Sequence, residues 1–570
     1  MLKTVTLYSV HVKHICIRIM ENCLEMNTDF RPFKTMHWIS LFLVAVLCIM
    51  DCNGSNILIA PFDQGYNSRM THMIKLGNIL SKKGHNINFL CSNVLQEHPL
   101  FKLPENEVAD AFSRFNVITY NVPPVDQSQA DLTGNQKKLN AMMDKPYSSV
   151  VREILAHLLP ATFKQTIEDM NTWQKISEAK LDLIIADEFA LTARVLGAHF
   201  NVPVIAYSIQ GPVPSTVDII YPLNPSYVPL DWSPSATSDI MNFWQRCRNI
   251  MEHLKVKYYF SATFQEVESM CLNMEHVKKE ACENVRNFYK TVSLVLMNRN
   301  DALHYPQPYM PNMVSIGSFV MEKPKPLTGT FKDLVEKSSK HGVIVVSFGS
   351  LFRRLPLEMA EIFAKAFATM DQTVIWSYEG ANPEALGENT IINKWIPQND
   401  LLGHSNVKLF VHHCGSTGTY EALYHAVPNV GIPFWADQPY NCDKLVNRVG
   451  SGASINPKGL TSEGFRSTME KVINNATYKK NALKAADIYH NQPMDLNEKV
   501  VYWVEYVIRH KGAPHLRSEG IFKLNFAQYF LLDIVGLFTL IGCFILGILL
   551  ICFRFMIKKL IFGSPKEKSD

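Results

Sequence analysis

The sequence lacks a strong charge bias, a recognisable cysteine pattern and a short internal repeat. Its 570 residues carry 56 basic and 52 acidic side chains, and the net charge of +4 is nearly neutral for a chain of this length. No basic stripe is present, so no nucleic-acid partner is expected. Twelve cysteines occur, but their spacing is neither that of a disulfide framework nor that of a zinc site. These absences argue against nucleic-acid-binding, disulfide-rich and zinc-finger proteins.

Apolar residues are abundant, with 47% hydrophobic against 19% charged side chains. The length allows two or three domains, or two large domains with appendages. Part of the apolar excess lies near the N-terminus, where residues 38–50 form an uncharged run that follows Arg31 and Lys34. That length is typical of a signal-peptide core. We expect cleavage before Ser55, with Met36 as the effective start.

A second apolar run, 534–553, is 20 uncharged residues long and can cross a bilayer. Basic residues follow it directly, which places that side in the cytosol; they are Arg554, Lys558 and Lys559. Lys566 and Lys568 near the end resemble a dilysine signal for retrieval to the endoplasmic reticulum. The same residues are also compatible with an ordinary solvated charged tail. We therefore expect a single-pass membrane protein with a lumenal body, and Asn475 in Asn-Ala-Thr is a glycosylation acceptor.

Short β-branched runs alternate with helical patterns in both halves of the chain, which predicts two doubly wound parallel sheets. The expected strands are 57–61, 86–90, 181–187, 202–208, 343–347, 373–378, 407–411 and 430–435, and the expected helices are 70–83, 190–200, 357–370 and 417–425. The proline-rich stretch 322–330 is the predicted linker. The predicted organisation is a leader (1–54), a first, acceptor-binding domain (55–321), a linker (322–335), a second domain (336–525), a span (526–553) and a tail (554–570).

The most informative segment runs from residue 395 to 438. Cys414, Gly415 and Ser416 form a small-residue turn between a strand and a helix, where unpaired N–H groups and the helix dipole suit a diphosphate. Glu421 lies about one turn into that helix, within reach of two ribose hydroxyls.

Further polar and aromatic residues surround this turn. Asp437 and Gln438 follow a buried strand, at the edge of the sheet where ligands of α/β proteins bind. Trp395 offers a face for a base, and Gln398 is in reach of the nucleoside. Singly, these residues are as well explained by core packing or solvated charge; together, at these spacings, they predict a nucleotide-sugar site. A metal site at His412, His413 and Cys414 is not favoured, because adjacent side chains on a strand point to opposite faces.

This segment resembles the donor-binding signature of the UDP-glycosyltransferase family, in particular its membrane-bound animal UDP-glucuronosyltransferases. The resemblance covers roughly residues 56–553 and implies the GT-B architecture, in which two α/β domains face a cleft. It implies transfer of a sugar, with inversion, from UDP-glucuronic acid or UDP-glucose to a small lipophilic acceptor, without metal or cofactor. Homo- or hetero-oligomers are compatible with it. Residues 95–180 and 221–234 are expected to shape the acceptor pocket.

The resemblance also assigns roles in the donor site. Trp395 is expected to stack on uracil and Gln398 to bond the nucleoside, whereas His413 contacts the diphosphate and Glu421 the ribose. Asp437 and Gln438 are expected to hold the transferred sugar, with Ser350, Gly415 and Ser416 in the turns beside the diphosphate. Two positions depart from the family pattern: Cys414 stands where glycine is commoner, and Asn429 where an apolar residue is usual.

The first domain departs from the family at the catalytic base. The family uses a histidine at the start of the first long helix, oriented by an aspartate whose equivalent is Asp187. Counting back from the family's Gly-His at Gly84 places Arg69 at the histidine position, and arginine stays protonated and cannot act as a base. Three interpretations follow: His72 substitutes as the base; Arg69 pairs with Asp187 and the acceptors need little deprotonation; or the protein binds a UDP-sugar without turnover. The intact donor motif favours a working transferase.

Overall fold

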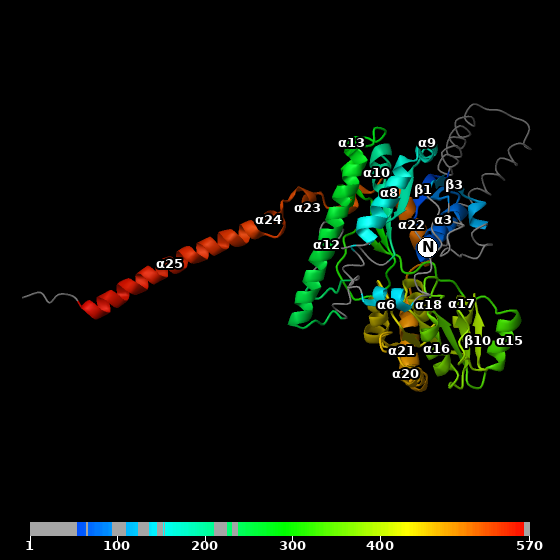
Figure 1. The fold of residues 1–570 in the computed structure, drawn as a ribbon. Helices are drawn as coiled ribbons and strands as arrows, with labels where there is room; N and C mark the ends of the chain where they lie inside the picture. The colour runs from blue at the N-terminus through cyan, green and yellow to red at the C-terminus, as the bar shows by residue number, and fades with distance from the viewer. Residues whose placement is uncertain are drawn as a thin grey trace, which may run out of the picture.

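The structure is a computed structural model that describes residues 54–63, 67–93, 110–122, 136–144, 152, 154–209, 225–230 and 238–563. Two α/β lobes lie one above the other, and a long helix projects away from them (Figure 1). The predicted signal sequence, its cleavage neighbourhood before residue 54, the dilysine tail and much of the predicted acceptor region lie outside the described residues.

The first lobe is built on a parallel sheet of seven described strands in the order β3-β2-β1-β4-β5-β6-β7. Alternate residues of its central strands enter two different cores, Leu58 and Ile184 on one face and Ile59 and Ile185 on the other. Both faces are therefore covered by helices, which explains the nearly continuous apolar strand sequences. The strands are β1 (Asn56–Ala60), β2 (Asn86–Ser92), β3 (Asn116–Tyr120), β4 (Leu183–Asp187), β5 (Val204–Ser208), β6 (Leu294–Met297) and β7 (Met313–Ser315).

Helices of the first lobe divide between these two faces. The helix α3 (Asn67–Lys82) packs on one face, since Met70, Met73 and Leu76 belong to the same core as Ile59. The helices on the other face are η1 (Ile154–Leu158), α8 (Leu159–Glu168), α9 (Met170–Glu178), α10 (Leu191–Phe200), α12 (Phe243–Leu272), α13 (Lys279–Cys282) and α14 (Asn284–Thr291).

The second lobe has a parallel sheet of six described strands in the order β10-β9-β8-β11-β12-β13. The strands are β8 (Val343–Ser347), β9 (Thr373–Ser377), β10 (Thr390–Asn393), β11 (Val407–His412), β12 (Asn429–Gly431) and β13 (Gly452–Ser454). Its helices are α15 (Gly329–Lys337), α16 (Leu357–Phe367), α17 (Gln398–Leu402), α18 (Ser416–Tyr424), α19 (Gln438–Asp443), η2 (Lys444–Val449), α20 (Ser462–Asn474) and α21 (Ala476–His490).

Two sequence predictions about this lobe need correction. The strand predicted over 430–435 ends at Gly431, because Pro433 has no N–H with which to continue the ladder. The predicted linker 322–335 is extended only in its proline-containing first part. From Gly329 onward it forms α15, which buries Val335 against the second lobe.

Two helices cross between the lobes, so no single boundary along the sequence separates the two cores. The helix α22 (Leu496–Arg509), predicted to belong to the second domain, buries Val500 and Val504 in the first lobe's core. In the opposite sense α6 (Gln136–Asp144) buries Leu139 in the second lobe's core. Neither crossing can be predicted from sequence periodicity, because periodicity identifies an apolar helix face but not the sheet against which it packs.

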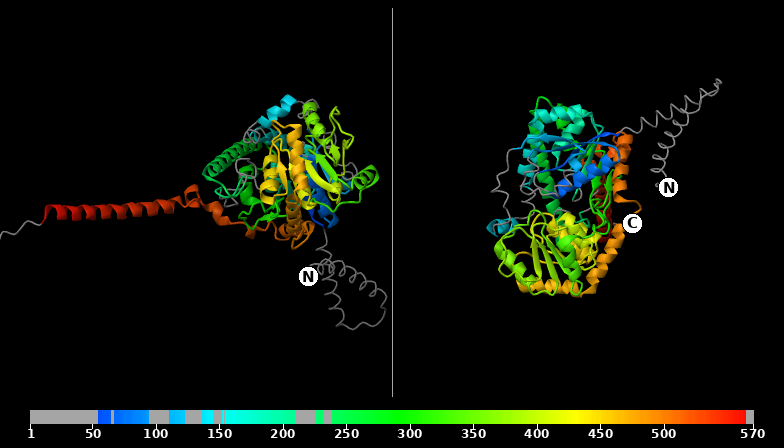
Figure 2. Two further views of the ribbon diagram at one scale, coloured as in Figure 1. Left: turned by 90° about the horizontal axis from the view of Figure 1, so that it is seen from below. Right: turned by 90° about the vertical axis from the view of Figure 1, so that its right-hand side faces the viewer.

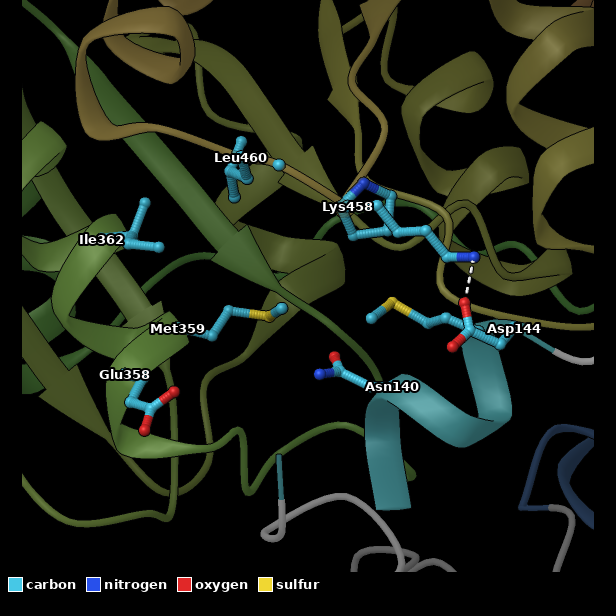
Figure 3. A pocket seen from close by; sticks show the side chains of 10 residues that line it. Asn140, Asp144, Glu358, Met359, Ile362, Lys458 and Leu460 are labelled. Atoms are coloured by element: carbon cyan, nitrogen blue, oxygen red, sulfur yellow. Dashed lines mark hydrogen bonds and ion pairs between the residues drawn. The ribbon is translucent and has the colours of Figure 1, made fainter. Parts of the chain in front are cut away.

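The α6 crossing leaves a cavity of about 380 Å³ between α6, α16 and the loop after β13 (Figure 3). Lys458 of that loop pairs with Asp144 of α6 across its rim. The lining residues are Asn140, Met143, Asp144, Glu358, Met359, Ile362, Pro457, Lys458, Gly459 and Leu460. None of them belongs to the predicted donor site.

The C-terminal helix α25 (Leu532–Phe562) is the one helix of the described residues that is long and apolar enough to cross a membrane. An 18-residue window of this helix has a mean hydropathy of 2.9, and no residue of that window is buried. The helix projects from the body in Figure 1 and in the left view of Figure 2, after η3 (Pro514–Leu516), α23 (Glu519–Lys523) and α24 (Phe526–Tyr529). The helix starts at Leu532 rather than at 526 and includes the first part of the predicted tail. Length and composition fit a single-pass membrane protein.

One disulfide is present in the described residues, between Cys271 at the end of α12 and Cys282 in α13. Their Cα atoms are 5.5 Å apart. This pair could not be predicted from the sequence, because a single pair at this spacing forms no repeating pattern.

Candidate active site

The turn between β11 and α18 has the features of an anion site. Gly415 precedes the first residue of α18, and no side chain caps the helix. Its first N–H groups are therefore open to a ligand. Two buried polar atoms at this turn, Thr417 Oγ1 and His413 Nδ1, have no hydrogen-bond partner among the described residues. Such atoms are expected where a polar ligand is to be bound.

The ring of His413 is held between two glycines. A Cβ atom on Gly349 would lie 2.6 Å from its Cε1 atom, and one on Gly415 would lie 2.4 Å from its Nε2 atom. Gly349 also has a φ of +73°, which favours glycine. Burial lowers the pKa of His413 to about 4, so the ring is neutral near pH 7. Ser350 follows Gly349, so the two turns that contain the predicted diphosphate contacts both flank this ring.

His412 and His413 occupy different surroundings, as the alternation of a strand requires. His412 is fully buried and stacks on Phe410, with ring centroids 4.5 Å apart. Within the part of the chain that the structure describes, no three His, Cys, Asp or Glu side chains are grouped to hold a metal ion.

Two of the side chains predicted to bind the nucleoside are hydrogen-bonded to each other. Gln398, at the start of α17, donates from Nε2 to an oxygen of Glu421 on α18. Glu421 is 8% exposed, and burial raises the pKa of its carboxyl group to about 7, against the effect of the Gln398 hydrogen bond. Trp395 precedes them in the chain and is 58% exposed, so its ring is available for stacking.

Asp437 and Gln438 lie at the start of α19. Asn441 Nδ2 donates to Asp437 Oδ2 at 2.7 Å. Gln438 differs from the prediction in part, because its Oε1 atom accepts hydrogen bonds from the backbone N–H groups of Phe434 and Trp435 at 2.8 and 3.1 Å. Its amide oxygen therefore shapes the turn, and only the amide nitrogen remains to donate to a sugar.

The two lobes act on each other electrostatically at this point. Burial raises the pKa of Asp437, whereas the Asn441 hydrogen bond and the positive charges of Lys444 and Arg69 lower it. Arg69 belongs to the first lobe, so the lobes are close enough here for its charge to act on Asp437 of the second lobe.

Arg69 and Asp187 form a buried ion pair. Nη1 of Arg69 lies 2.6 Å from Oδ1 and 2.7 Å from Oδ2 of Asp187. The side chains are 5% and 0% exposed. The guanidinium carbon lies 4.3 Å from the ring centroid of Phe189, and the Phe189 N–H donates to Asp187 at 2.9 Å. This geometry matches the interpretation in which Arg69 pairs with Asp187 and the acceptors need little deprotonation.

His72 is buried in the first lobe. It lies one turn along α3 from Arg69, is 1% exposed, contacts the Tyr207 hydroxyl through Nδ1 and packs against Phe319. Burial lowers its pKa to about 3, with smaller effects from Lys75 and Arg69. In this structure His72 is a buried side chain of the first lobe, which argues against its use as a substitute base.

Sequence reasoning missed Asn298, which follows β6. Its carbonyl oxygen accepts from the Tyr420 hydroxyl at 2.9 Å, and its Nδ2 atom lies 3.5 Å from Ser416 Oγ at the α18 turn. Asn298 therefore joins the first lobe to the predicted diphosphate turn. Its place at the carboxyl end of a buried parallel strand was the available signal.

Comparison with known proteins gives the same picture. The family model described as "UDP-glucoronosyl and UDP-glucosyl transferase" matches residues 55–567. UDP-glucuronosyltransferase 1A1 of Mus musculus is 30% identical over 532 residues, covering 92% of this chain and 96% of the relative. UDP-glucuronosyltransferase 2A1 of Mus musculus is 34% identical over 401 residues, covering 70% and 74%.

Solved structures agree on the fold. The glycotransferase of kitacinnamycin superimposes with a TM-score of 0.51 at 18% identity, covering 80% of this chain and 99% of that one. The calicheamicin glycosyltransferase CalG4 gives a TM-score of 0.51 at 15% identity, with the same coverage. Two facing parallel-sheet lobes of this kind are the GT-B fold. With the family model spanning nearly all of the chain from residue 55, the protein belongs to the UDP-glucuronosyl and UDP-glucosyl transferase family, enzymes that transfer a sugar from a UDP-sugar to an acceptor.

Proposed function

We propose that this enzyme transfers glucuronic acid or glucose from its UDP-sugar to small lipophilic acceptors that need little deprotonation, such as amines, acidic phenols and carboxylates. The Arg69–Asp187 ion pair is the observation that carries the proposal. It fills the position of the family's base with a group that stays protonated, while the residues predicted to bind the donor nucleotide are all present in the second lobe.

The donor's three parts correspond to three groups of side chains. Trp395 stacks on the uracil ring, and the bonded pair Gln398 and Glu421 holds the nucleoside and the ribose hydroxyls. The open N-terminus of α18, with Ser416 and Thr417, binds the diphosphate. Asp437 accepts from hydroxyls of the transferred sugar, and the Gln438 amide nitrogen donates to the same sugar.

The proposed reaction inverts the anomeric carbon of the sugar as the acceptor attacks it and UDP leaves. The dipole of α18 and the neutral ring of His413 stabilise the charge that develops on the diphosphate. The acceptor supplies its own nucleophilicity, because the charge on Asp187 is compensated by Arg69. The missing base should lower the transfer rate least for acceptors that are neutral amines or are already ionised near pH 7.

A donor and acceptor panel tests this proposal. Microsomal full-length protein is incubated with UDP-glucuronic acid or UDP-glucose and with matched amine, carboxylate, acidic phenol and simple phenol acceptors. We expect product from the first three classes at rates about 10²-fold above the simple phenol, since general-base catalysis contributes at least that factor where it is required. Equal or faster transfer to the simple phenol would contradict the proposal. UDP binding without turnover of any pair would instead support a binding protein.

The affinity for UDP should depend on the protonation of Glu421. Ribose hydroxyls donate to the ionised carboxylate, so binding favours the deprotonated form and the affinity falls as the pH drops through about 7. Glu421→Gln should weaken UDP binding by about 10–100-fold at pH 8, given the usual strength of hydrogen bonds to charged groups. It should also remove this pH dependence, measured by calorimetry between about pH 6 and pH 8.

Glu336→Gln is the matched control, because Glu336 lies on α15 with its side chain 58% exposed. It should leave both the affinity and its pH dependence unchanged. A pH dependence that persists in Glu421→Gln would show that another group, such as the UDP phosphate or Asp437, is responsible.

We further propose that the body lies in the lumen of the endoplasmic reticulum. The basic residues Arg554, Lys558 and Lys559 lie at the C-terminal end of α25, which favours a cytosolic end there. The Cys271–Cys282 disulfide suits an oxidising compartment. Asn475 is exposed at the start of α21, where its Oδ1 atom accepts from the Thr477 N–H and its Nδ2 atom is left to carry a glycan.

A further inference from the structure

Two buried cysteines meet beside the donor site. Cys414 follows β11 in the turn that leads to α18, and Cys442 lies on α19, which begins at Gln438. They are 0% and 1% exposed. In sequence they are far apart, but each belongs to one of the two segments that hold the donor, the diphosphate turn and the sugar-binding helix.

Both sulfur atoms point to the same place, against Gly431 of β12. A Cβ atom on Gly431 would lie 2.0 Å from Cys442 Sγ and 2.3 Å from Cys414 Sγ. The missing side chain of Gly431 therefore leaves a space that the two thiols fill together. Burial and contact with Cys442 raise the pKa of the Cys414 thiol well above its usual value.

The backbone at Cys414 is unusual for a residue with a side chain. Its φ is +60°, a left-handed conformation that costs on the order of 1–2 kcal/mol outside glycine. Glycine would satisfy this turn without that cost, and it is the residue commoner here in the family. A cysteine at this position therefore needs another reason, and a sulfur in contact with a second sulfur supplies one.

The other described cysteines make this pair distinctive. Cys271 and Cys282 already form a disulfide, so the body contains a bond that is maintained in oxidising compartments. Cys414 and Cys442 are free thiols in this structure, as are Cys91 on β2 and Cys247 on α12. Cys543 and Cys552 lie on the exposed α25.

We infer that Cys414 and Cys442 form a second disulfide that ties the diphosphate turn to the sugar-binding helix. The bond forms by exchange with a disulfide oxidant, glutathione disulfide or an oxidoreductase. The thiolate of one cysteine attacks the oxidant and expels one thiol, and the second cysteine then displaces the other. In total the two cysteines lose two protons and two electrons, and the oxidant becomes two thiols. Because both sulfurs are buried in the folded protein, the exchange takes place before the second lobe closes.

The bond would fix the left-handed turn at Cys414 and hence the direction of the N–H groups at Gly415 and Ser416. A turn that is fixed before the ligand arrives loses less entropy on binding. The oxidised enzyme should therefore bind UDP several-fold more tightly than the reduced enzyme. This consequence rests on the proposed donor site, whereas the existence of the bond does not.

Peptide mass spectrometry tests the bond directly. Full-length protein from microsomes is denatured in maleimide without reductant, digested and analysed. We expect the peptides that contain Cys414 and Cys442 to be joined, with the loss of two hydrogen atoms, and to separate after reduction. The proposal is overturned if both cysteines carry maleimide without reduction, even after refolding in glutathione disulfide. A linked pair combined with no UDP binding would refute the proposed function and leave the disulfide standing.

The variant Cys414→Gly distinguishes a disulfide at Cys414 from a free thiol that only fills space. If the bond exists, its loss should lower the unfolding temperature of the second lobe by about 5–10 °C and weaken UDP binding several-fold. If it does not, a reductant should leave the unfolding temperature of the second lobe of the wild-type protein unchanged, and Cys414→Gly should cost only the packing of one buried thiol, which would contradict the proposal. Cys247→Ser, on α12 away from both segments, is the control and should change neither quantity.

Discussion

Replacing Arg69 with histidine is expected to raise the rate of transfer to simple phenols by about 10²-fold or more. Asp187 is already in place beside this position, so it can orient an imidazole and stabilise its charged form. The new base must be neutral to accept a proton, so the rate should rise with pH through the pKa of the introduced imidazole. Initial rates with both UDP-sugars across a pH series measure the effect.

Arg69→Gln is the matched control, because it removes the positive charge without supplying a base. It should give no gain on simple phenols. If Arg69→His instead lowers transfer to every acceptor, Arg69 has a role of its own beside Asp437, whose pKa it already influences. A gain in both variants would mean that the guanidinium charge, rather than the missing base, limits the wild-type enzyme.

Replacing Asp187 with alanine is expected to lower the free energy of unfolding of the first lobe by about 3–5 kcal/mol, the usual cost of leaving one member of a buried ion pair without its partner. The guanidinium group of Arg69 would remain buried against Phe189, and the Phe189 N–H would lose its acceptor. Thermal or urea unfolding of the detergent-solubilised chain, followed by hydrogen exchange of β1 and β4, would locate the loss in the first lobe.

The double variant Arg69→Met with Asp187→Ala distinguishes this explanation from a general packing defect. Methionine keeps an apolar contact with Phe189 and removes the buried charge, so most of the lost stability should return. If the double variant is as unstable as Asp187→Ala alone, the carboxylate stabilises the lobe mainly through the turn at Phe189. Asp182→Ala at the exposed start of β4 breaks a different carboxylate contact, to the Asn56 N–H, and should cost much less.

The donor half was predictable because its residues lie close together in the sequence. Strand β11, the turn at Gly415 and helix α18 were identified from an apolar run, small residues and a following helical pattern, and the structure confirms their order. The contact between Gln398 and Glu421 then follows from two parallel strands that end at the same edge of a sheet. Local patterns could not show that the Gln438 amide oxygen is occupied by backbone N–H groups, since side-chain direction depends on the turn geometry.

The catalytic half depended on contacts between distant residues. Arg69 and Asp187 are 118 positions apart, and their pairing, one of the alternatives that the sequence left open, appears only in the folded structure. The burial of His72 against Tyr207 could not be predicted for a similar reason, because its helical position is compatible with either a core or a surface side chain. The crossings of α6 and α22 between the lobes are a further case.

By itself, then, the sequence determined the class of fold, the donor-binding segment and the apolar C-terminal helix, because strand, helix and turn preferences and a contiguous motif are local properties of a chain. Only the tertiary structure decided that Arg69 is held by Asp187, that His72 is core, and that Cys414 and Cys442 share the space over Gly431. Each of these depends on which side chains from distant segments fill the same volume, and burial and charge pairing are set by that packing rather than by neighbours in the sequence.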